Sequence, residues 1–150
     1  MEEVKLKCLP SDDDAKQLGI TPRIIGWVRS PLKRLEDCPH WQDSGPEAII
    51  EIKSEYAPAL VGVTVGQKIL LITWLHKSDR TFLQGCRNKV HWKQPRGVFN
   101  SRSPARPNPI GLHEVTVLDI QTKDCQPELR VNALEALDGT PVLDIKRADR

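Results

Sequence analysis

A stiff, arginine-bearing segment at residues 97–111 is the part of this chain whose residue types most clearly suggest chemistry. It carries Arg102 and Arg106 between two glycines, with prolines at positions 104, 107 and 109. Because proline fixes φ and lacks an N–H, we predict a shaped loop here, not a helix or a central strand. A rigidly held guanidinium is suited to gripping a carboxylate or another anion. The alternative is a rigid loop that only ties two strands together.

Positive charge is concentrated around this loop, although the net charge of the whole chain is only +2. Between residues 77 and 106 the only acidic residue is Asp79. Aromatic side chains are interleaved with the basic ones, which are Lys77, Arg80, Arg87, Lys89, Lys93, Arg96, Arg102 and Arg106. Such a mixture favours binding of a polyanion, usually nucleic acid. A solvated basic face without a ligand is the alternative reading.

The cysteines and histidines show no spacing typical of a metal site. No CxxC pair occurs among Cys8, Cys38, Cys86 and Cys125, and the histidines at 40, 76, 91 and 113 are equally scattered. We therefore predict no metal, and free thiols in a reducing compartment. The glycine patterns of dinucleotide-binding folds and P-loops are also missing, as is the GxSxG turn of serine hydrolases.

The distribution of apolar residues predicts a cytoplasmic protein with no membrane partner. No apolar run approaches the roughly 20 residues that a membrane-spanning helix needs. The first residues, MEEVK, lack the basic and then apolar layout of a signal peptide.

Alternation of apolar and polar residues predicts an all-β, mainly antiparallel fold with short helical turns. The segment 68–75 is nearly all apolar and is predicted to be a central strand that delivers His76 and Lys77 at its end. Further strands are expected at 23–30, 48–53, 111–121, 128–134 and 142–145. Asp138-Gly139 is a strong turn dipeptide. We expect a lead-in over 1–22, with a polar or briefly helical stretch after Ser11, and one domain over 23–150, built as a barrel or a sandwich.

Three motifs of the chain resemble those of the TrmO (YaeB/TsaA-like) family. They are IGWVRSP at 25–31, GVFNSRSPARPNPIG at 97–111 and DGTPVLDIK at 138–146, and they lie in the family's order. The resemblance implies a small closed or nearly closed β-barrel. It also implies an S-adenosylmethionine-dependent methyltransferase that works as a homodimer and methylates N6 of threonylcarbamoyladenosine next to the tRNA anticodon.

The resemblance also implies where the cofactor binds. The residues it points to are Pro39, His76, Lys77, Arg102, Asp138, Gly139, Thr140 and Pro141. Arg102 would clamp the cofactor carboxylate, and Asp138 would accept from its ammonium or ribose, or balance the sulfonium charge. Asp138 is also the candidate catalytic base, with water as the alternative. A plain hairpin turn at 138–139 and a strand-end role for His76 are the structural alternatives, and salt bridges are the alternative for Arg29 and Arg106.

Under the same resemblance, the basic segment would meet tRNA. The candidate contacts are Arg87, Lys89, Trp92, Lys93 and Arg96, with an aromatic ring available to stack on a splayed base. Fold and cofactor do not fix the methyl acceptor. A methyltransferase with another acceptor, and a non-catalytic module that binds S-adenosylmethionine or RNA, therefore stay open. Lys77 stands where bacterial members tend to carry glutamine.

Overall fold

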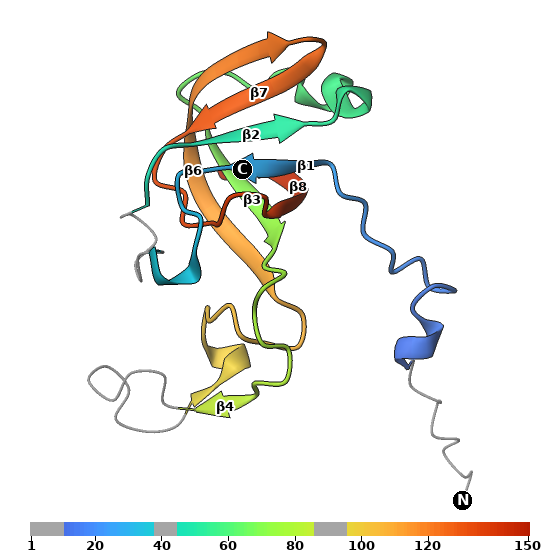
Figure 1. The fold of residues 1–150 in the computed structure, drawn as a ribbon. Helices are drawn as coiled ribbons and strands as arrows, with labels where there is room; N and C mark the ends of the chain where they lie inside the picture. Colours follow the sequence, from blue (N-terminus) through green and yellow to red (C-terminus); the bar gives the residue numbers. More distant parts are fainter. Residues whose placement is uncertain (1–10, 38–44, 86–95) are drawn as a thin grey trace, which may run out of the picture.

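Six strands of the computed structural model close into one antiparallel barrel, in the order β1-β2-β7-β6-β3-β8 (Figure 1). The structure describes residues 11–37, 45–85 and 96–150. The barrel strands are β1 (Gly26–Arg29), β2 (Ala48–Ile52), β3 (Lys68–Trp74), β6 (Ile110–Lys123), β7 (Gln126–Val131) and β8 (Pro141–Arg147). A separate two-stranded ribbon pairs β4 (Gln84–Gly85) with β5 (Arg96–Gly97). The expected all-β barrel is confirmed.

Short 3-10 turns are the only helical elements in the described ranges. They are η1 (Asp12–Asp14), η2 (Leu35–Asp37), η4 (Ser54–Leu60) and η5 (Val98–Asn100). η1 begins at Ser11, whose N–H and hydroxyl both bond the Asp14 carboxylate, so a capped turn starts here. Backbone bonds such as that from Leu18 N–H to Asp14 O continue the turn to Ile20. Pro58 lies inside η4, where a longer α-helix would lose a backbone hydrogen bond.

The long strand β6 joins the two halves of the barrel. Its first half pairs with β3, from Trp74↔Ile110 to Lys68↔Thr116, and its second half pairs with β7 after a register shift near Leu118. That shift explains why the sequence alternation breaks at Leu118. Such a bulge bends the strand, which lets one strand serve both halves of a closed sheet.

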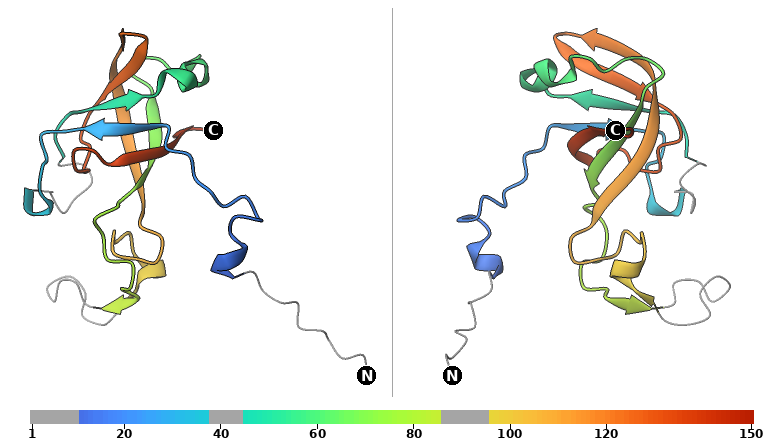
Figure 2. Two further views of the ribbon diagram at one scale, coloured as in Figure 1. Left: turned by 45° about the vertical axis from the view of Figure 1, so that its right-hand side comes forward. Right: turned by 180° about the vertical axis from the view of Figure 1, so that it is seen from behind.

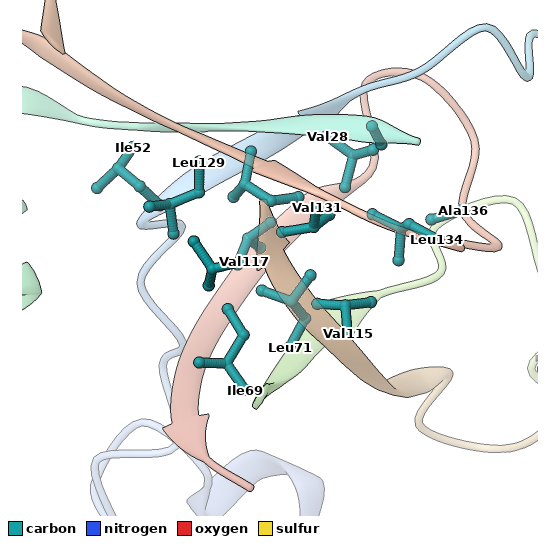
Figure 3. Packing of buried hydrophobic residues seen from close by; sticks show 13 residues of the cluster. Val28, Ile52, Ile69, Leu71, Val115, Val117, Leu129, Val131, Leu134 and Ala136 are labelled. Atoms are coloured by element: carbon teal, nitrogen blue, oxygen red, sulfur yellow. The ribbon is translucent and has the colours of Figure 1, made fainter. Parts of the chain in front are cut away.

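Strand alternation directs one apolar side chain after another into the barrel. Ile50, Leu71, Val117 and Leu129 are fully buried, and each comes from a different strand. Figure 3 shows these strands sending their side chains toward a common centre. Each fully buried aliphatic side chain of this size contributes about 1.5–3 kcal/mol. This core makes the barrel a rigid support for the loops at its two ends.

One end of the barrel, which we call the loop end, gathers every segment singled out by the sequence motifs. Strands β1, β3 and β7 finish there, and β2, β6 and β8 begin there, as their antiparallel pairings require. The segment after β7 covers this end, with Leu134 and Ala136 buried. From the same end a projecting arm, described over residues 75–85 and 96–109, extends away from the barrel (Figures 1 and 2).

Two local readings of the sequence differ from the structure. The plain hairpin that was the structural alternative for Asp138-Gly139 is not formed, because β7 pairs with β2 and β6, and β8 pairs with β1 and β3. The turn is therefore a connection across the loop end. The strand expected to reach Leu134 ends at Val131, because the chain then leaves the sheet at Ala133, whose φ is 42°.

The tight turn between β6 and β7 is strained. Asp124 and Cys125 form its two-residue loop, with φ angles of 51° and 64°. Both positions of such a turn require positive φ, which glycine adopts without steric cost. We expect Cys125→Gly to raise the free energy of unfolding by about 0.5–1 kcal/mol, measured by urea denaturation. Cys125→Ala removes the thiol but keeps the strain, so a gain in that control would contradict the explanation.

Candidate functional site

Asp138 is held at the loop end by the segment that leaves β1. Its carboxylate accepts the Ser30 N–H at 2.9 Å and pairs with the Lys33 ammonium at 2.8 Å. The backbone is tied to the same segment, because Asp138 N–H donates to Leu32 O and Gly139 N–H donates to Val28 O. The first and third sequence motifs thus form one structural unit.

The charge on Asp138 follows from these contacts. The hydrogen bond from Lys33, with the bond from the Ser30 N–H, holds the pKa of the Asp138 carboxyl below its ordinary value of 3.8. The side chain is therefore ionised at neutral pH and is a weak proton acceptor. This environment suits a counter-charge to a cation better than it suits a general base.

The remaining residues of the turn have different roles. Gly139 is exposed, with φ 81°, so glycine is needed there for the backbone conformation. Thr140 is buried at 2% exposure, and its carbonyl accepts the Val28 N–H at 2.9 Å. Pro141 begins β8 opposite Trp27. Gly139 is thus the exposed part of this turn, and Thr140 is its buried part.

The two arginines of the proline-rich loop have different positions: Arg106 bonds the loop backbone, and Arg102 is exposed at the loop surface. Arg106 donates to the carbonyls of Val98, Ser101 and Ser103 at 2.7–3.2 Å. Arg102 is exposed and reaches back to Leu112 O at 3.4 Å. A guanidinium that bonds three backbone carbonyls organises its own loop. Arg106 therefore shapes the loop, by backbone bonds and not by the salt bridge that was the alternative reading.

A second arginine from the basic segment fixes the same loop from outside. Arg80 donates to Pro107 O at 2.8 Å and to the Asn108 side chain at 3.4 Å. Its guanidinium lies 5.2 Å from the centre of the Trp74 ring, within range of a cation–π interaction. Part of the basic segment is thus structural, and so is Arg29, which pairs with Glu51 and with Glu128 at 3.6 Å.

A buried polar pair, one member of which lies within reach of the Arg102 charge, is the feature that the sequence motifs did not reveal. His113 Nε2 lies 2.8 Å from Thr73 Oγ1, and both side chains are buried. A Cβ on Gly111 would come within 2.3 Å of Thr73 Oγ1 and 2.6 Å of His113 Nε2. Position 111 must therefore be glycine for the pair to fit. The signal in the sequence is the alternation Gly111, His113, Val115, which places the histidine on the core face of β6.

Thr73 connects the two parts of the candidate site. In the sheet it stands between Gly111 of β6 and Val142 of β8. The Arg102 loop leads into β6, and the 138–141 turn leads into β8. Both segments therefore lead into strands that lie on either side of one buried residue.

Of the other predicted site residues, the structure describes three, and five lie outside the described ranges. His76 and Lys77 are exposed in the turn directly after β3, at the loop end as expected. Arg96 is exposed at the start of β5. Pro39, Arg87, Lys89, Trp92 and Lys93 lie outside the described residues. Among the residues that the structure describes, no group of three metal-ligating side chains comes together. No helix in the same part of the chain is long and apolar enough to cross a membrane.

Burial makes the acid stability of the fold depend on His113. Burial, with a smaller contribution from the Arg102 charge, lowers the pKa of His113 from 6.5 to about 4. The unfolded chain therefore binds this proton first as the pH falls, and stability is lost between pH 6.5 and about 4. We expect wild type to lose about 2–3 kcal/mol more than His113→Gln over this range, measured by urea denaturation. If the free energy of unfolding falls equally with pH in the two proteins, His113 is not a neutral buried histidine. Asp138 does not disturb the comparison, because its carboxyl titrates below 3.8 in both proteins.

Comparison with known proteins agrees with this geometry. A family model described as the tRNA-methyltransferase O N-terminal domain matches residues 27–148. The chain belongs to the TrmO family. A relative from Methanothermobacter thermautotrophicus, named as a probable S-adenosyl-L-methionine-binding protein, is 43% identical over 131 residues, which are 86% of this chain and 90% of the relative. An S-adenosyl-L-methionine-binding protein from Archaeoglobus fulgidus is 39% identical, over 82% of this chain and 85% of the relative.

Solved TrmO structures have the same fold. The crystal structure of TrmO from Pseudomonas aeruginosa matches with a TM-score of 0.67 and 25% identity, over 86% of this chain and 55% of that chain. The chain thus spans about half the length of the solved TrmO protein that it matches. The expected family membership is confirmed for nearly the whole of this chain.

Proposed function

We propose that this TrmO-family chain binds S-adenosylmethionine at its loop end and transfers the methyl group to N6 of threonylcarbamoyladenosine in tRNA. The observation that carries the proposal is the placement of Arg102 and the 138–141 turn on the two sides of Thr73. This arrangement places a surface guanidinium and an ionised carboxylate at one rigid barrel end. The names of the relatives and the family description support the cofactor and the reaction class.

The side chains present match the functional groups of this cofactor. Arg102 offers paired N–H donors to the carboxylate. Asp138, already ionised, offers an acceptor for the ammonium or a ribose hydroxyl, and a negative charge for a sulfonium. The exposed backbone at Gly139 permits close approach, and His76 is available to stack on the adenine. When bound, the cofactor supplies an electrophilic methyl group.

The protein's own contribution to transfer is position and electrostatics. Methyl transfer is an in-line displacement, so fixing donor and acceptor supplies much of the rate. Arg106, Arg80 and the buried Thr73–His113 pair keep the Arg102 loop in place. Because Asp138 is a weak proton acceptor, we propose that water removes the N6 proton. Asp138 then balances cationic charge.

The deciding experiment measures transfer. The protein is incubated with methyl-labelled S-adenosylmethionine and total tRNA, and digested nucleosides are separated. Label in threonylcarbamoyladenosine supports the full proposal, and label in another nucleoside gives the acceptor of a related methyltransferase. Cofactor binding without any transfer would favour a non-catalytic binding module, which the weak basicity of Asp138 also permits. All of these reactions would take place in the cytoplasm, where tRNA is available.

We further propose that two copies associate through the projecting arm and that its basic residues contact tRNA. Phe99 and Leu83 are 86% and 61% exposed on this arm, which is unusual for large apolar side chains. Lys77, Arg96 and Arg102 are exposed on the same arm. Association would cover the apolar side chains and leave the cations at the rim of a shared surface.

Replacement of Phe99 tests the arm as a dimer surface. We expect Phe99→Asp to weaken self-association at least tenfold in sedimentation equilibrium, because it places a charge in an apolar contact. Val65→Asp is the matched control, since Val65 is 60% exposed at the other end of the barrel. Equal effects of the two variants, or none from Phe99→Asp, would remove the arm from the interface.

A further inference from the structure

Both carboxylate oxygens of Asp138 are already engaged within the protein. Oδ1 accepts the Ser30 N–H at 2.9 Å, and Oδ2 pairs with the Lys33 ammonium at 2.8 Å. The proposed function offers the same carboxylate to the cofactor. A ligand group that binds Asp138 must therefore share an oxygen with one of these two partners or replace it.

The two partners differ in how easily they can leave. Ser30 is buried at 4% exposure, and its N–H belongs to a backbone segment that is tied down, since Leu32 O accepts the Asp138 N–H at 2.8 Å. Lys33 reaches Asp138 through a long side chain that is 63% exposed. An exposed ion pair contributes little stability, because water solvates both charges. Lys33 is therefore the partner that a ligand can replace.

Solvent reaches the Asp138–Lys33 pair. The Asp138 side chain is 35% exposed, and Gly139 beside it is exposed and carries no side chain. Within the described ranges, Asp138 is the only acid that pairs with the Lys33 ammonium. Arg29, whose charge also acts on Asp138, has carboxylate partners of its own. An approaching ligand therefore meets an ion pair from which the lysine can move away.

Charge decides which ligand groups can take the place of Lys33. Hydrogen bonds from the Lys33 ammonium and the Ser30 N–H hold the pKa of the Asp138 carboxyl below 3.8, so the carboxyl is ionised at neutral pH. A cationic group that replaces the ammonium keeps this negative charge balanced. A neutral ribose hydroxyl would leave the charge unbalanced and would form the weaker bond. The exchange thus favours the ammonium or the sulfonium of the cofactor over its ribose.

We propose that Lys33 is a built-in competitor for Asp138, and that a cationic group of the cofactor displaces the Lys33 ammonium when it binds. The proposal rests on the proposed function, because it concerns the same cofactor site. It narrows the role of Asp138, since the ribose hydroxyl is no longer among its ligand partners. It also makes Lys33 a residue that determines specificity, because a ligand without positive charge cannot displace it.

Isothermal titration calorimetry on variants of the ion pair tests the exchange. Lys33→Gln removes the competing charge but keeps a polar side chain. We expect it to tighten S-adenosylmethionine binding about threefold to fivefold, which corresponds to the loss of one exposed ion pair. Lys33→Arg keeps the charge and should bind no more tightly than wild type. In the Asp138→Asn background, Lys33→Gln should bring no gain, because the competition needs the carboxylate.

Two controls separate this exchange from other effects of a lost charge. Lys68→Gln removes an exposed lysine at the start of β3, at the opposite barrel end, and should leave the affinity at its wild-type value. Methylthioadenosine has the adenine and the ribose of the cofactor but neither of its cationic groups. Its affinity, followed by NMR titration, should gain nothing from Lys33→Gln. An equal gain for both ligands, or from Lys68→Gln, would overturn the proposal.

The ion pair also has a readout that needs no ligand. Lys33→Gln should raise the pKa of the Asp138 carboxyl toward 3.8, because it removes the hydrogen bond that lowers this pKa most. NMR titration of the carboxyl carbon measures the shift, and an unchanged pKa would overturn the proposal. Failure of S-adenosylmethionine to bind any of these proteins would refute the proposed cofactor site itself. Binding to wild type that Lys33→Gln does not tighten would refute the exchange alone.

Discussion

Arg102→Ala is expected to abolish detectable S-adenosylmethionine binding in isothermal titration calorimetry. In the proposed site the guanidinium donates to the cofactor carboxylate, and charged hydrogen bonds of this kind contribute about 1.5–3 kcal/mol. Losing a bidentate contact at the upper end of that range weakens binding about a hundredfold. Affinity that stays at the wild-type value would remove Arg102 from the cofactor site.

The same variant has a second readout that does not require ligand. The charge of Arg102 helps to lower the pKa of the buried His113, so Arg102→Ala should raise that pKa above its value of about 4. Titration of the His113 ring signals by NMR measures this shift and shows that the fold is intact. Arg102→Lys keeps the positive charge but loses the planar pair of donors. It should leave His113 near its wild-type pKa and still weaken cofactor binding.

Gly111→Ala is expected to cause the largest loss of stability among single methyl additions near the site. The new Cβ would lie within 2.3 Å of Thr73 Oγ1 and 2.6 Å of His113 Nε2, and both groups are held inside the barrel. Overpacking of a filled interior costs about 1–3 kcal/mol, and separating a buried polar pair adds to that cost. We expect a loss of about 3 kcal/mol in urea denaturation, together with weaker cofactor binding.

Gly97→Ala is the matched control for this substitution. A Cβ at position 97 would meet only Leu83 O, at 4.0 Å, so the variant should keep wild-type stability. The double variant Gly111→Ala, Thr73→Ala removes the nearer obstacle and should recover part of the lost stability. If Gly111→Ala is as stable as wild type, Gly111 does not lock the Thr73–His113 pair.

The barrel strands could be read from the sequence because each combines alternation with a clear stop. Ile50 and Leu71 lie on buried faces that the pattern predicts, and Pro31 follows β1. The ends of β7 and the connection at Asp138 could not be read in the same way. The connection at Asp138 depends on hydrogen bonds to Val28 and Leu32, more than a hundred residues earlier in the chain. The chain just after β7 depends on bonds from Asn132 N–H to Thr116 O and from Leu134 N–H to Pro46 O.

The candidate site was only partly visible in the sequence for a similar reason. Arg102 and Asp138 stand in recognisable motifs, but the motifs do not say which arginine of a basic segment is structural. Arg106 is distinguished by three bonds to loop carbonyls, and Arg80 by a bond to Pro107 O at 2.8 Å. Arg102 is exposed, and its bond to Leu112 O is longer, at 3.4 Å. His113 lies in none of the three sequence motifs, and its role follows from its burial, the nearby charge of Arg102 and its contact with Thr73.

Because Thr73 lies in the barrel ladder between β6 and β8, the proposed cofactor site is anchored in the sheet itself. The amides of Thr73 and His113 can exchange with deuterium only when the sheet itself opens, so their protection should approach that of Leu71 in the core. The amides of Phe99 and Asn100 on the projecting arm should exchange much earlier. Under the proposed function, changes in the arm could therefore alter the choice of methyl acceptor while the barrel keeps the same slow opening rate and the proposed cofactor site.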